Sequence, residues 1–387
     1  MTWDELWDKW IAAITVEPAT EKWYVSNYEC HIGPRYGDKP IDETEPNDVD
    51  DWLAALRAGA VVTGRPGSRR TYPYKKRSTD GIRMQMSLML DDAIGRWKLL
   101  DANPLKVKRS PMRGKRVDRV QQDSRPKPVA TPERVLAAAV NMHEVVGPGT
   151  LAGMAAFMRV LTAGWTGIRP GEQSALAVAG CRPSAKVPKL IVDDRKGNYE
   201  ELPHQEPRLK APKGGDGREV LLNIGYAALL AAWLRYIDGP VVFPDDAGER
   251  WRHSTWGYWW YKARDGGRVT LRIERPDGSR GLDRRELLPA AAGVEYKGLR
   301  RIHNVWLTEA GVPDVARSHR LGHGMSDPLQ AAYSEVSEIL ETQLLAALQA
   351  MWVEAFAGYA GPAGLEVIRQ FAPRFGMGAA SRQAIAP

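Results

Sequence analysis

The amino-acid sequence predicts a mainly α-helical protein of two domains with a few short β-strands in the second, an α+β fold. Apolar residues recur at helical spacing through most of the chain. Two short apolar segments in the second half, KLIVDD and GREVLLN, are instead typical of strands. The chain has 387 residues, of which 43% are hydrophobic, and this is enough to form two cores.

The first domain is predicted to be a small helical unit over residues 1–104. A helix is indicated at residues 48–56, and Pro104 is expected to end the last helix of the unit. Two further helices are predicted by apolar residues at helical spacing: Trp3, Leu6, Trp7, Trp10 and Ile11 in one, and Ile82, Met86, Met89, Leu90, Ala93, Ile94 and Trp97 in the other. We expect these side chains to form the core of the unit.

A basic segment of this unit leads into its last helix. Seven cations between Arg65 and Arg83 surround a single acid, Asp80, among Gly and Pro residues that favour a loop. Contact with phosphates and an ordinary solvated surface are both consistent with this pattern. If the segment contacts DNA, the residues expected to do so are Arg69, Arg70, Lys75, Lys76 and Arg77.

A basic linker, residues 105–130, is predicted to join the two domains. From Leu105 to Lys127 it holds nine basic and two acidic residues, so its charge of +7 equals the formal net charge of the whole chain. Such a stretch either binds a polyanion or is a solvated tether, and both alternatives remain open. Under the first, Arg113, Lys115 and Arg116 are expected to contact DNA.

The second domain is predicted over residues 131–360, followed by an Ala/Gly/Pro-rich tail at 361–387. Thr131 can cap its first helix, and Pro132 favours the same N-terminus. A helix at 150–163 leads to a tight turn that carries Arg169. Further helices are expected at residues 226–236, 255–262, 298–310, 314–321 and 337–356, and an inserted hairpin or loop at 272–292.

Composition excludes several classes of protein. The two cysteines, Cys30 and Cys181, provide neither a disulfide framework nor metal-ligand spacing, which favours a reducing cytoplasm. No apolar run is long enough to span a membrane, and the acidic, aromatic start MTWDELWDKW is unlike a signal peptide. No acidic cluster has the spacing of metal ligands, so we expect no metal and no cofactor.

The segment from Lys297 to Tyr333 is the most informative part of the chain. It places Lys297 and Arg300 three residues apart, then Leu-Gly-His ending at His323, then a lone Tyr333 ten residues later. Upstream, the sequence TGIRPGE supplies another arginine, Arg169, in a turn between helices. A phenol can attack phosphorus while cations hold the charge that develops on the phosphoryl oxygens, so this set suits a phosphodiester.

These motifs resemble those of the tyrosine recombinases, the phage-integrase family. TGIRPGE matches the turn of the family's first catalytic arginine, which makes Arg169 that arginine and Glu172 its acidic companion. PKGGDGREVLL matches the segment of the catalytic lysine and puts Lys213 in that place. In the second motif, normally H-x-L-R-H, this chain has KGLRR, so Arg300 matches the second arginine.

The remaining positions complete the resemblance with two departures, both in the second motif. Lys297 replaces the common His of the second motif, and Arg301 replaces its second His. Leu-Gly-His matches the third motif without change, which makes His323 a catalytic histidine, and Tyr333 stands at the place of the nucleophile. The other nearby histidines, His303 and His319, lie outside the motif positions, and we expect them to be structural.

The resemblance implies a fold, mainly α with a small antiparallel β-sheet in the catalytic domain, that closes as a two-domain C-shaped clamp on DNA. Residues 1–104 would be the helical core-binding (SAM-like) domain and 131–360 the catalytic domain. Because residues 3–11 already resemble the first core-binding helix, the chain is expected to lack an arm-binding domain, unless one precedes the sequence given.

The implied activity is site-specific recombination or integration, of a phage or mobile element, through a 3′-phosphotyrosine and without metal or ATP. The expected partners are double-stranded attachment sites, a homotetramer that synapses them, and an excisionase or host DNA-bending factor. The expected location is the bacterial cytoplasm, on the nucleoid when bound to DNA. Two alternatives stay open: a type IB topoisomerase-like nicking-closing enzyme, and a DNA-binding regulator with impaired catalysis.

Overall fold

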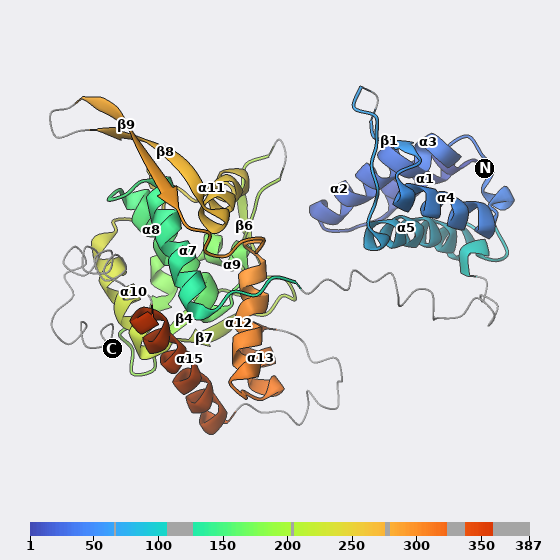
Figure 1. The fold of residues 1–387 in the computed structure, drawn as a ribbon. Helices are drawn as coiled ribbons and strands as arrows, with labels where there is room; N and C mark the ends of the chain where they lie inside the picture. Colours follow the sequence, from blue (N-terminus) through green and yellow to red (C-terminus); the bar gives the residue numbers. More distant parts are fainter. Residues whose placement is uncertain (66, 107–126, 203–204, 275–278, 323–336, 359–387) are drawn as a thin grey trace. The chain divides into compact units, whose positions relative to one another are not determined.

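The computed structural model describes all residues except 66, 107–126, 203–204, 275–278, 323–336 and 359–387 (Figure 1). The chain divides into two compact units, Met1–Pro126 and Lys127–Pro387. Most of the basic linker, the C-terminal tail, and the predicted residues His323 and Tyr333 lie outside the described residues.

The first unit is helical and has its own core. Its helices are α1 (Trp3–Ala13), α2 (Pro18–Asn27), which continues through a π-helical turn at Tyr28–Ile32 into α3 (Gly33–Tyr36), α4 (Pro46–Ala58) and α5 (Lys76–Gly95). Two strands, β1 (Val62–Thr63) and β2 (Arg70–Thr71), pair antiparallel before α5. Most of the predicted apolar residues of α1 and α5 are buried in this core, together with Trp52 and Leu56 of α4.

The last helix of the first unit ends earlier than predicted. α5 ends at Gly95, so the prediction that Pro104 ends it is wrong. Lys98 adopts a left-handed conformation with φ 55°, which a helix cannot contain, and the amide of Leu99 turns back to the carbonyl oxygen of Ala93 at 2.9 Å. Pro104 instead begins a short 3-10 turn, Pro104–Lys106.

The second unit is built around a helical hairpin, α7 (Pro132–Val146) and α8 (Leu151–Thr166). As predicted, Thr131 caps α7, with its hydroxyl accepting from the amide of Arg134 at 3.4 Å. Every residue of α8 from Ala152 to Thr166 is buried, so this helix is the centre of the core. The helices around it are α9 (Pro170–Ala175), α10 (Ile224–Tyr236), α11 (His253–Asp265), α12 (Gly298–Glu309), α13 (Asp314–Leu321) and α15 (Glu338–Gly358).

The strands of the second unit form small antiparallel sheets. The two predicted strands, β4 (Lys189–Val192) and β7 (Arg218–Leu221), pair directly, with buried Leu190 opposite Val220, and β3 (Cys181–Arg182) borders β4. The intervening segment forms a separate pair, β5 (Asn198–Glu200) with β6 (Arg208–Lys210). A long hairpin, β8 (Gly267–Glu274) and β9 (Arg280–Leu287), extends away from the helices (Figure 1).

These elements confirm the predicted fold class, mainly helical with a small antiparallel sheet in the second unit. Among the described helices, none combines the length and the apolar composition needed to cross a membrane.

Candidate active site

The turn that carries Arg169 is shaped by the sequence before it. α8 ends at Gly167, whose φ of 67° is left-handed and favours glycine. A side chain there would also collide with the core, because an added Cβ would lie 2.6 Å from the ring of His303 and 2.8 Å from Leu321. The next residue, Ile168, is buried, and this anchor leaves Arg169 at the start of α9.

Glu172 holds Arg169 in place. Its carboxylate accepts from the backbone amide of Arg169 and from its guanidinium, both at 2.7 Å. Arg218, at the start of β7, forks onto the same carboxylate at 3.0 and 2.7 Å. The predicted pairing of Arg169 with Glu172 is therefore present, and Arg218 is a second partner that the motif alone did not assign.

The charge state of Glu172 follows from these contacts. Burial acts to raise the pKa of its carboxyl group, but the hydrogen bonds and charges of Arg218 and Arg169 outweigh burial and lower the pKa to about 2. The carboxylate is therefore ionised over the physiological pH range, which keeps both guanidinium groups paired.

Arg300 reaches the same place from α12. Its guanidinium donates to the carbonyl oxygen of Gly167 at 2.9 Å and to that of Leu321. Burial, with repulsion from Arg169 and Arg218, lowers the pKa of Arg300 to about 10 although Glu172 acts in the opposite direction. Glu172 pairs with Arg169 and Arg218, and Arg300 adds a third positive charge within electrostatic range of the same carboxylate. The excess of positive charge is suited to an anionic ligand.

The same arginines contact the backbone that leads to His323. Arg169 donates to the carbonyl oxygen of Gly322 at 3.2 Å, next to the Leu321 oxygen that Arg300 contacts. Gly322 ends α13 with φ 60°. The predicted residues Arg169 and Arg300 therefore come together at the point where the chain enters the segment that carries His323 and Tyr333, although those two residues lie outside the described part.

A buried arginine that the motifs did not reveal supports this corner. Arg320 donates to the carbonyl oxygens of Leu221 at 2.8 Å and Trp165 at 2.9 Å, and to Nε2 of His303 at 3.0 Å. Because Nδ1 of His303 lies 2.8 Å from the carbonyl oxygen of Gly164, this ring is fully engaged and structural, as expected. The sequence contained one indication that Arg320 is buried: it lies four residues after buried Ala316, on the same face of α13.

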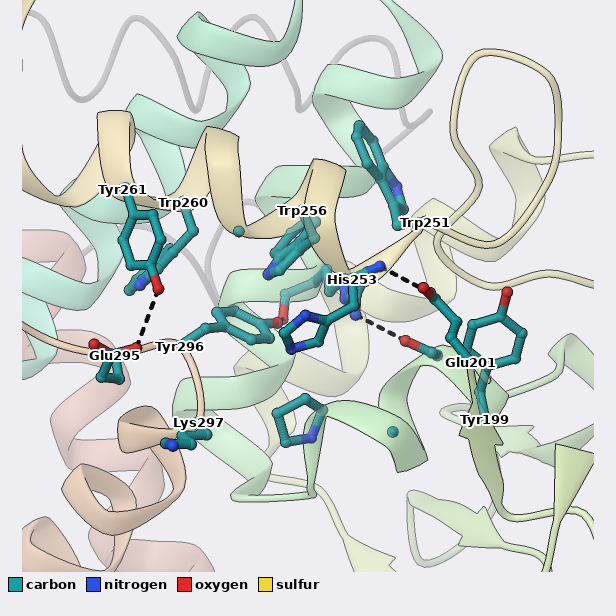
Figure 2. A pocket seen from close by; sticks show the side chains of 15 residues that line it. Tyr199, Glu201, Trp251, His253, Trp256, Trp260, Tyr261, Glu295, Tyr296 and Lys297 are labelled. Carbon is teal, nitrogen blue, oxygen red and sulfur yellow. Dashed lines mark hydrogen bonds between the residues drawn. The ribbon is translucent and has the colours of Figure 1, made fainter. Parts of the chain in front are cut away.

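The two predicted lysines are less closely joined to the arginines. Lys213 is exposed in the turn between β6 and β7, which the amide of Gly215 closes onto the carbonyl oxygen of Pro212 at 2.9 Å. Among the described residues it has no hydrogen bond or ion pair. Lys297 is exposed at the N-terminus of α12, one turn before Arg300, and borders a separate cavity (Figure 2).

Arg301, which replaces the last histidine of the second motif, makes its contact outside the arginine cluster. Its guanidinium donates to the carbonyl oxygen of Pro128, at the start of the second unit. It therefore ties α12 to the segment before α7 instead of joining the arginine cluster. His319 is exposed near the end of α13.

The expected DNA-contacting cations of the first unit lie around β2 and the start of α5. Arg69, Arg70, Lys75 and Arg77 are exposed, whereas Lys76 is partly buried and pairs with Asp80 at 3.0 Å. Two acids from outside this segment also reach its cations: Glu29 lies 2.8 Å from Arg65, and Asp50 lies 2.5 Å from Arg83. The other three, Arg113, Lys115 and Arg116, lie outside the described residues.

Comparison with known proteins identifies the fold. No family model matches the chain, and no curated protein does. The structure is similar to that of the Tn1549 transposon integrase in complex with transposon right end DNA, at 15% identity and TM-score 0.58, over 88% of this chain and 98% of that chain. It is also similar to a lambda integrase dimer bound to a core site, at 16% identity and TM-score 0.52, over 87% of this chain and 96% of that chain. Both units therefore have the fold found in these integrases.

Proposed function

We propose that this chain is a tyrosine recombinase that cuts and rejoins DNA at specific sites, as an integrase of a phage or other mobile element. The observation that carries the proposal is the convergence of Arg169 and Arg300, from separate segments, onto the backbone just before His323. The fold shared with integrases solved in complex with DNA supports it.

In the proposed reaction Tyr333 attacks a backbone phosphorus. Its phenolate forms a bond to phosphorus while the bond from phosphorus to the 5′-oxygen breaks, which gives a 3′-phosphotyrosine and a 5′-hydroxyl. A phenol has an ordinary pKa of about 10, so the cations of the site must favour its ionised form. A 5′-hydroxyl of a second duplex then reverses the attack and completes strand exchange without ATP.

The other residues stabilise charge and supply a proton. Arg169 and Arg300 donate to the non-bridging oxygens, where negative charge develops, and His323 donates to the same oxygens. Lys213 protonates the leaving 5′-oxygen, and its exposed turn leaves it accessible to DNA. Lys297 donates to a phosphate oxygen from the N-cap position of α12. Glu172 contacts no substrate and positions Arg169.

The proposed partners follow from this activity. The first unit would act as a core-binding domain and the second as the catalytic domain, with the basic linker crossing the backbone between them. Two duplex attachment sites would be synapsed by four copies of the chain, with an excisionase or a host DNA-bending factor setting direction. The reaction would take place in the cytoplasm of a bacterial host.

The decisive experiment tests Tyr333 as the nucleophile. A suicide substrate nicked near the cleavage point should trap a covalent adduct at a 3′-phosphate with the wild-type chain, in excess EDTA. Tyr333→Phe removes only the hydroxyl, so it should bind DNA and form no adduct. Tyr261→Phe, which alters an exposed tyrosine of the same unit, is the matched control and should form the adduct normally.

Three results would contradict the proposal. An adduct formed by Tyr333→Phe, or a trapped peptide that contains another tyrosine such as Tyr296, would show that Tyr333 is not the nucleophile. Adduct formation without strand exchange between two duplexes would instead indicate a nicking-closing enzyme. DNA binding without any adduct in the wild-type chain would indicate a regulator.

A further inference from the structure

A cavity of about 580 Å³ lies beside the candidate active site, in the second unit. α11 forms one side of it, and the segments that carry Tyr199 and Tyr296 form the other (Figure 2). Pro170 and Lys297 also line it, so it adjoins both segments that hold the catalytic arginines. The proposed recombination mechanism assigns no role to its interior.

A buried arginine lines this cavity. Arg159 is only 4% exposed and lies within α8, the central helix of the unit. Its guanidinium donates to the hydroxyl of Ser174 at 2.8 Å and stacks over the ring of Trp256, 4.1 Å from its centroid. Burial lowers the pKa of Arg159, although the phenol of Tyr296 acts in the opposite direction.

Arg159 has no anionic partner in the described part of the chain. Among the described residues no ion pair forms to Arg159, and its Nε has no hydrogen-bond acceptor. Glu201 is the acid that attracts it electrostatically, but that carboxylate instead accepts from the amide of His253 at 2.8 Å. A buried charge with only neutral partners is costly, so a site of this kind is suited to an anion from outside.

The side chains that line the cavity indicate what kind of apolar group the anion carries. Trp251, Trp256 and Trp260 are buried aromatic side chains on its lining, and Tyr199 stands at the opposite side (Figure 2). The indole N–H of Trp256 also lacks an acceptor among the described residues. Flat apolar walls with a few convergent donors are typical of sites for small planar ligands, and the volume lies in the usual range.

The charge of the lining limits the charge of the ligand. Arg159 and Lys297 are balanced by Glu201 and Glu295, so the formal charge of the lining is zero. A single negative charge satisfies Arg159, whereas a doubly charged phosphate would be repelled by the two carboxylates. A carboxylate also matches the planar fork of a guanidinium.

We propose that this cavity binds a small monocarboxylate with a planar apolar body. The carboxylate lies against the guanidinium of Arg159, and the body packs against Trp251 and Trp256. Binding of this ligand requires neither DNA nor Tyr333, so the inference stands apart from the proposed recombinase activity.

Calorimetry on the full chain with matched pairs of probes tests the site. Indole-3-acetate and benzoate each have a neutral amide of nearly the same shape, indole-3-acetamide and benzamide. At least one acid should bind saturably and more tightly than its amide, by roughly tenfold or more, because the amide cannot form the charge-assisted hydrogen bond to a buried guanidinium. If neither acid binds better than its amide, the proposal is wrong.

Two substitutions then locate the site. Arg159→Gln should abolish the preference for the acid, whereas Arg159→Lys should keep part of it. Glu201→Gln removes a nearby negative charge and should tighten acid binding by about threefold or more without affecting the amide. Tighter acid binding in Glu201→Gln cannot result from misfolding, so it supports the proposal even if Arg159→Gln fails to fold. Unchanged acid affinity in Glu201→Gln would overturn the proposal.

A nucleotide tests the alternative that the planar anion bound in this cavity carries a phosphate instead of a carboxylate. Adenosine monophosphate combines an aromatic base with a phosphate, and it should bind more weakly than the better acid. Tighter binding of this nucleotide, abolished in Arg159→Gln, would overturn the monocarboxylate assignment in favour of a nucleotide site.

Discussion

The basic side chains of the two units differ in their hydrogen-bond partners and in their burial. In the second unit each arginine of the Glu172 cluster makes two or more hydrogen bonds, to a carboxylate or to backbone carbonyl oxygens. In the first unit Arg69, Arg70, Lys75 and Arg77 are exposed, and Lys76 has one partner, Asp80. Cations that are hydrogen-bonded and partly buried are oriented before a ligand binds, which suits catalysis at a single phosphate. Exposed cations suit contact with any phosphate nearby.

The strongest test of this contrast is Glu172→Gln. The substitution leaves Arg169 and Arg218 without their anion, so the free energy of unfolding should fall by roughly 3–5 kcal/mol. Urea denaturation measures it. The matched control is Glu219→Gln, because Glu219 pairs with Lys189 at 2.8 Å on the surface and its removal should cost less than about 1 kcal/mol. Equal decreases would show that burial of the cluster adds nothing.

The same carboxylate predicts a pH dependence. Because the pKa of Glu172 is lowered to about 2 in the folded chain, its stabilisation is fully present above the unfolded value of about 4.3 and is lost as pH falls through about 2. Thermal unfolding of wild type and Glu172→Gln should therefore converge between pH ~4 and ~2. A difference in stability that stays constant over that range would contradict the assigned ionisation.

The next largest effect is expected at Arg300. Arg300→Gln should slow DNA cleavage by on the order of 10²-fold or more while DNA affinity stays nearly unchanged, because the donor acts on charge that develops in the transition state. Single-turnover cleavage and equilibrium binding measure the two effects. Arg301→Gln, on the same helix but directed to Pro128, should cleave normally. Normal cleavage with weak binding in Arg300→Gln would make Arg300 a DNA-positioning residue.

The cations predicted to contact DNA outside the Glu172 cluster should affect binding and its salt dependence instead of catalysis. Each cation that no longer reaches a phosphate should reduce the slope of log affinity against log salt by roughly 0.9, equally for cognate and random DNA. Fluorescence anisotropy over a salt series measures this for two triple variants, Arg69→Gln/Arg70→Gln/Arg77→Gln and Arg113→Gln/Lys115→Gln/Arg116→Gln. An unchanged slope in either variant would show that its segment does not bind the DNA backbone.

The smallest effect is expected at Lys76, a partly buried cation with one surface partner. Lys76→Ala removes an ion pair to Asp80 within one helix and should lower the free energy of unfolding by about 0.3–0.5 kcal/mol. Arg77→Ala, on the same turn and exposed, should change it less. Chemical denaturation compares the two, and a decrease in Lys76→Ala comparable to that in Glu172→Gln would remove the distinction between the two sets of cations.

Periodicity in the sequence predicted most helices because it reports which face of a helix is buried. It failed at the end of α5, where the left-handed residue Lys98 stops the helix although apolar residues continue to Trp97. It also failed to predict α2 and the following π-helical turn, since Pro18–Asn27 has almost no separation of apolar and polar faces.

The candidate site was predictable only in part. TGIRPGE contained the glycine, the buried anchor and the acid that fix Arg169, so one short motif carried the local structure. The contacts of Arg218, Arg320 and Arg159 join distant segments, so spacing along the chain could place Arg320 on a buried helix face but could not reveal the partners of any of the three. Arg159 did leave one visible sign, a single charge in the otherwise apolar sequence of α8, but the sequence alone could not show which cavity it lines.

The hydrogen bonds that Arg169 and Arg300 make within the protein also determine how many of their N–H donors are left for an anionic ligand. A guanidinium has five N–H donors, and contacts to described residues of the chain use two on the side chain of each arginine. Among the described residues, nothing accepts from the other three donors of either arginine, so six donors remain in all. A phosphodiester has two non-bridging oxygens, so one phosphate between the two arginines would use only part of this set. The donors that the phosphate does not engage would be solvated by water or bound by a second anionic group.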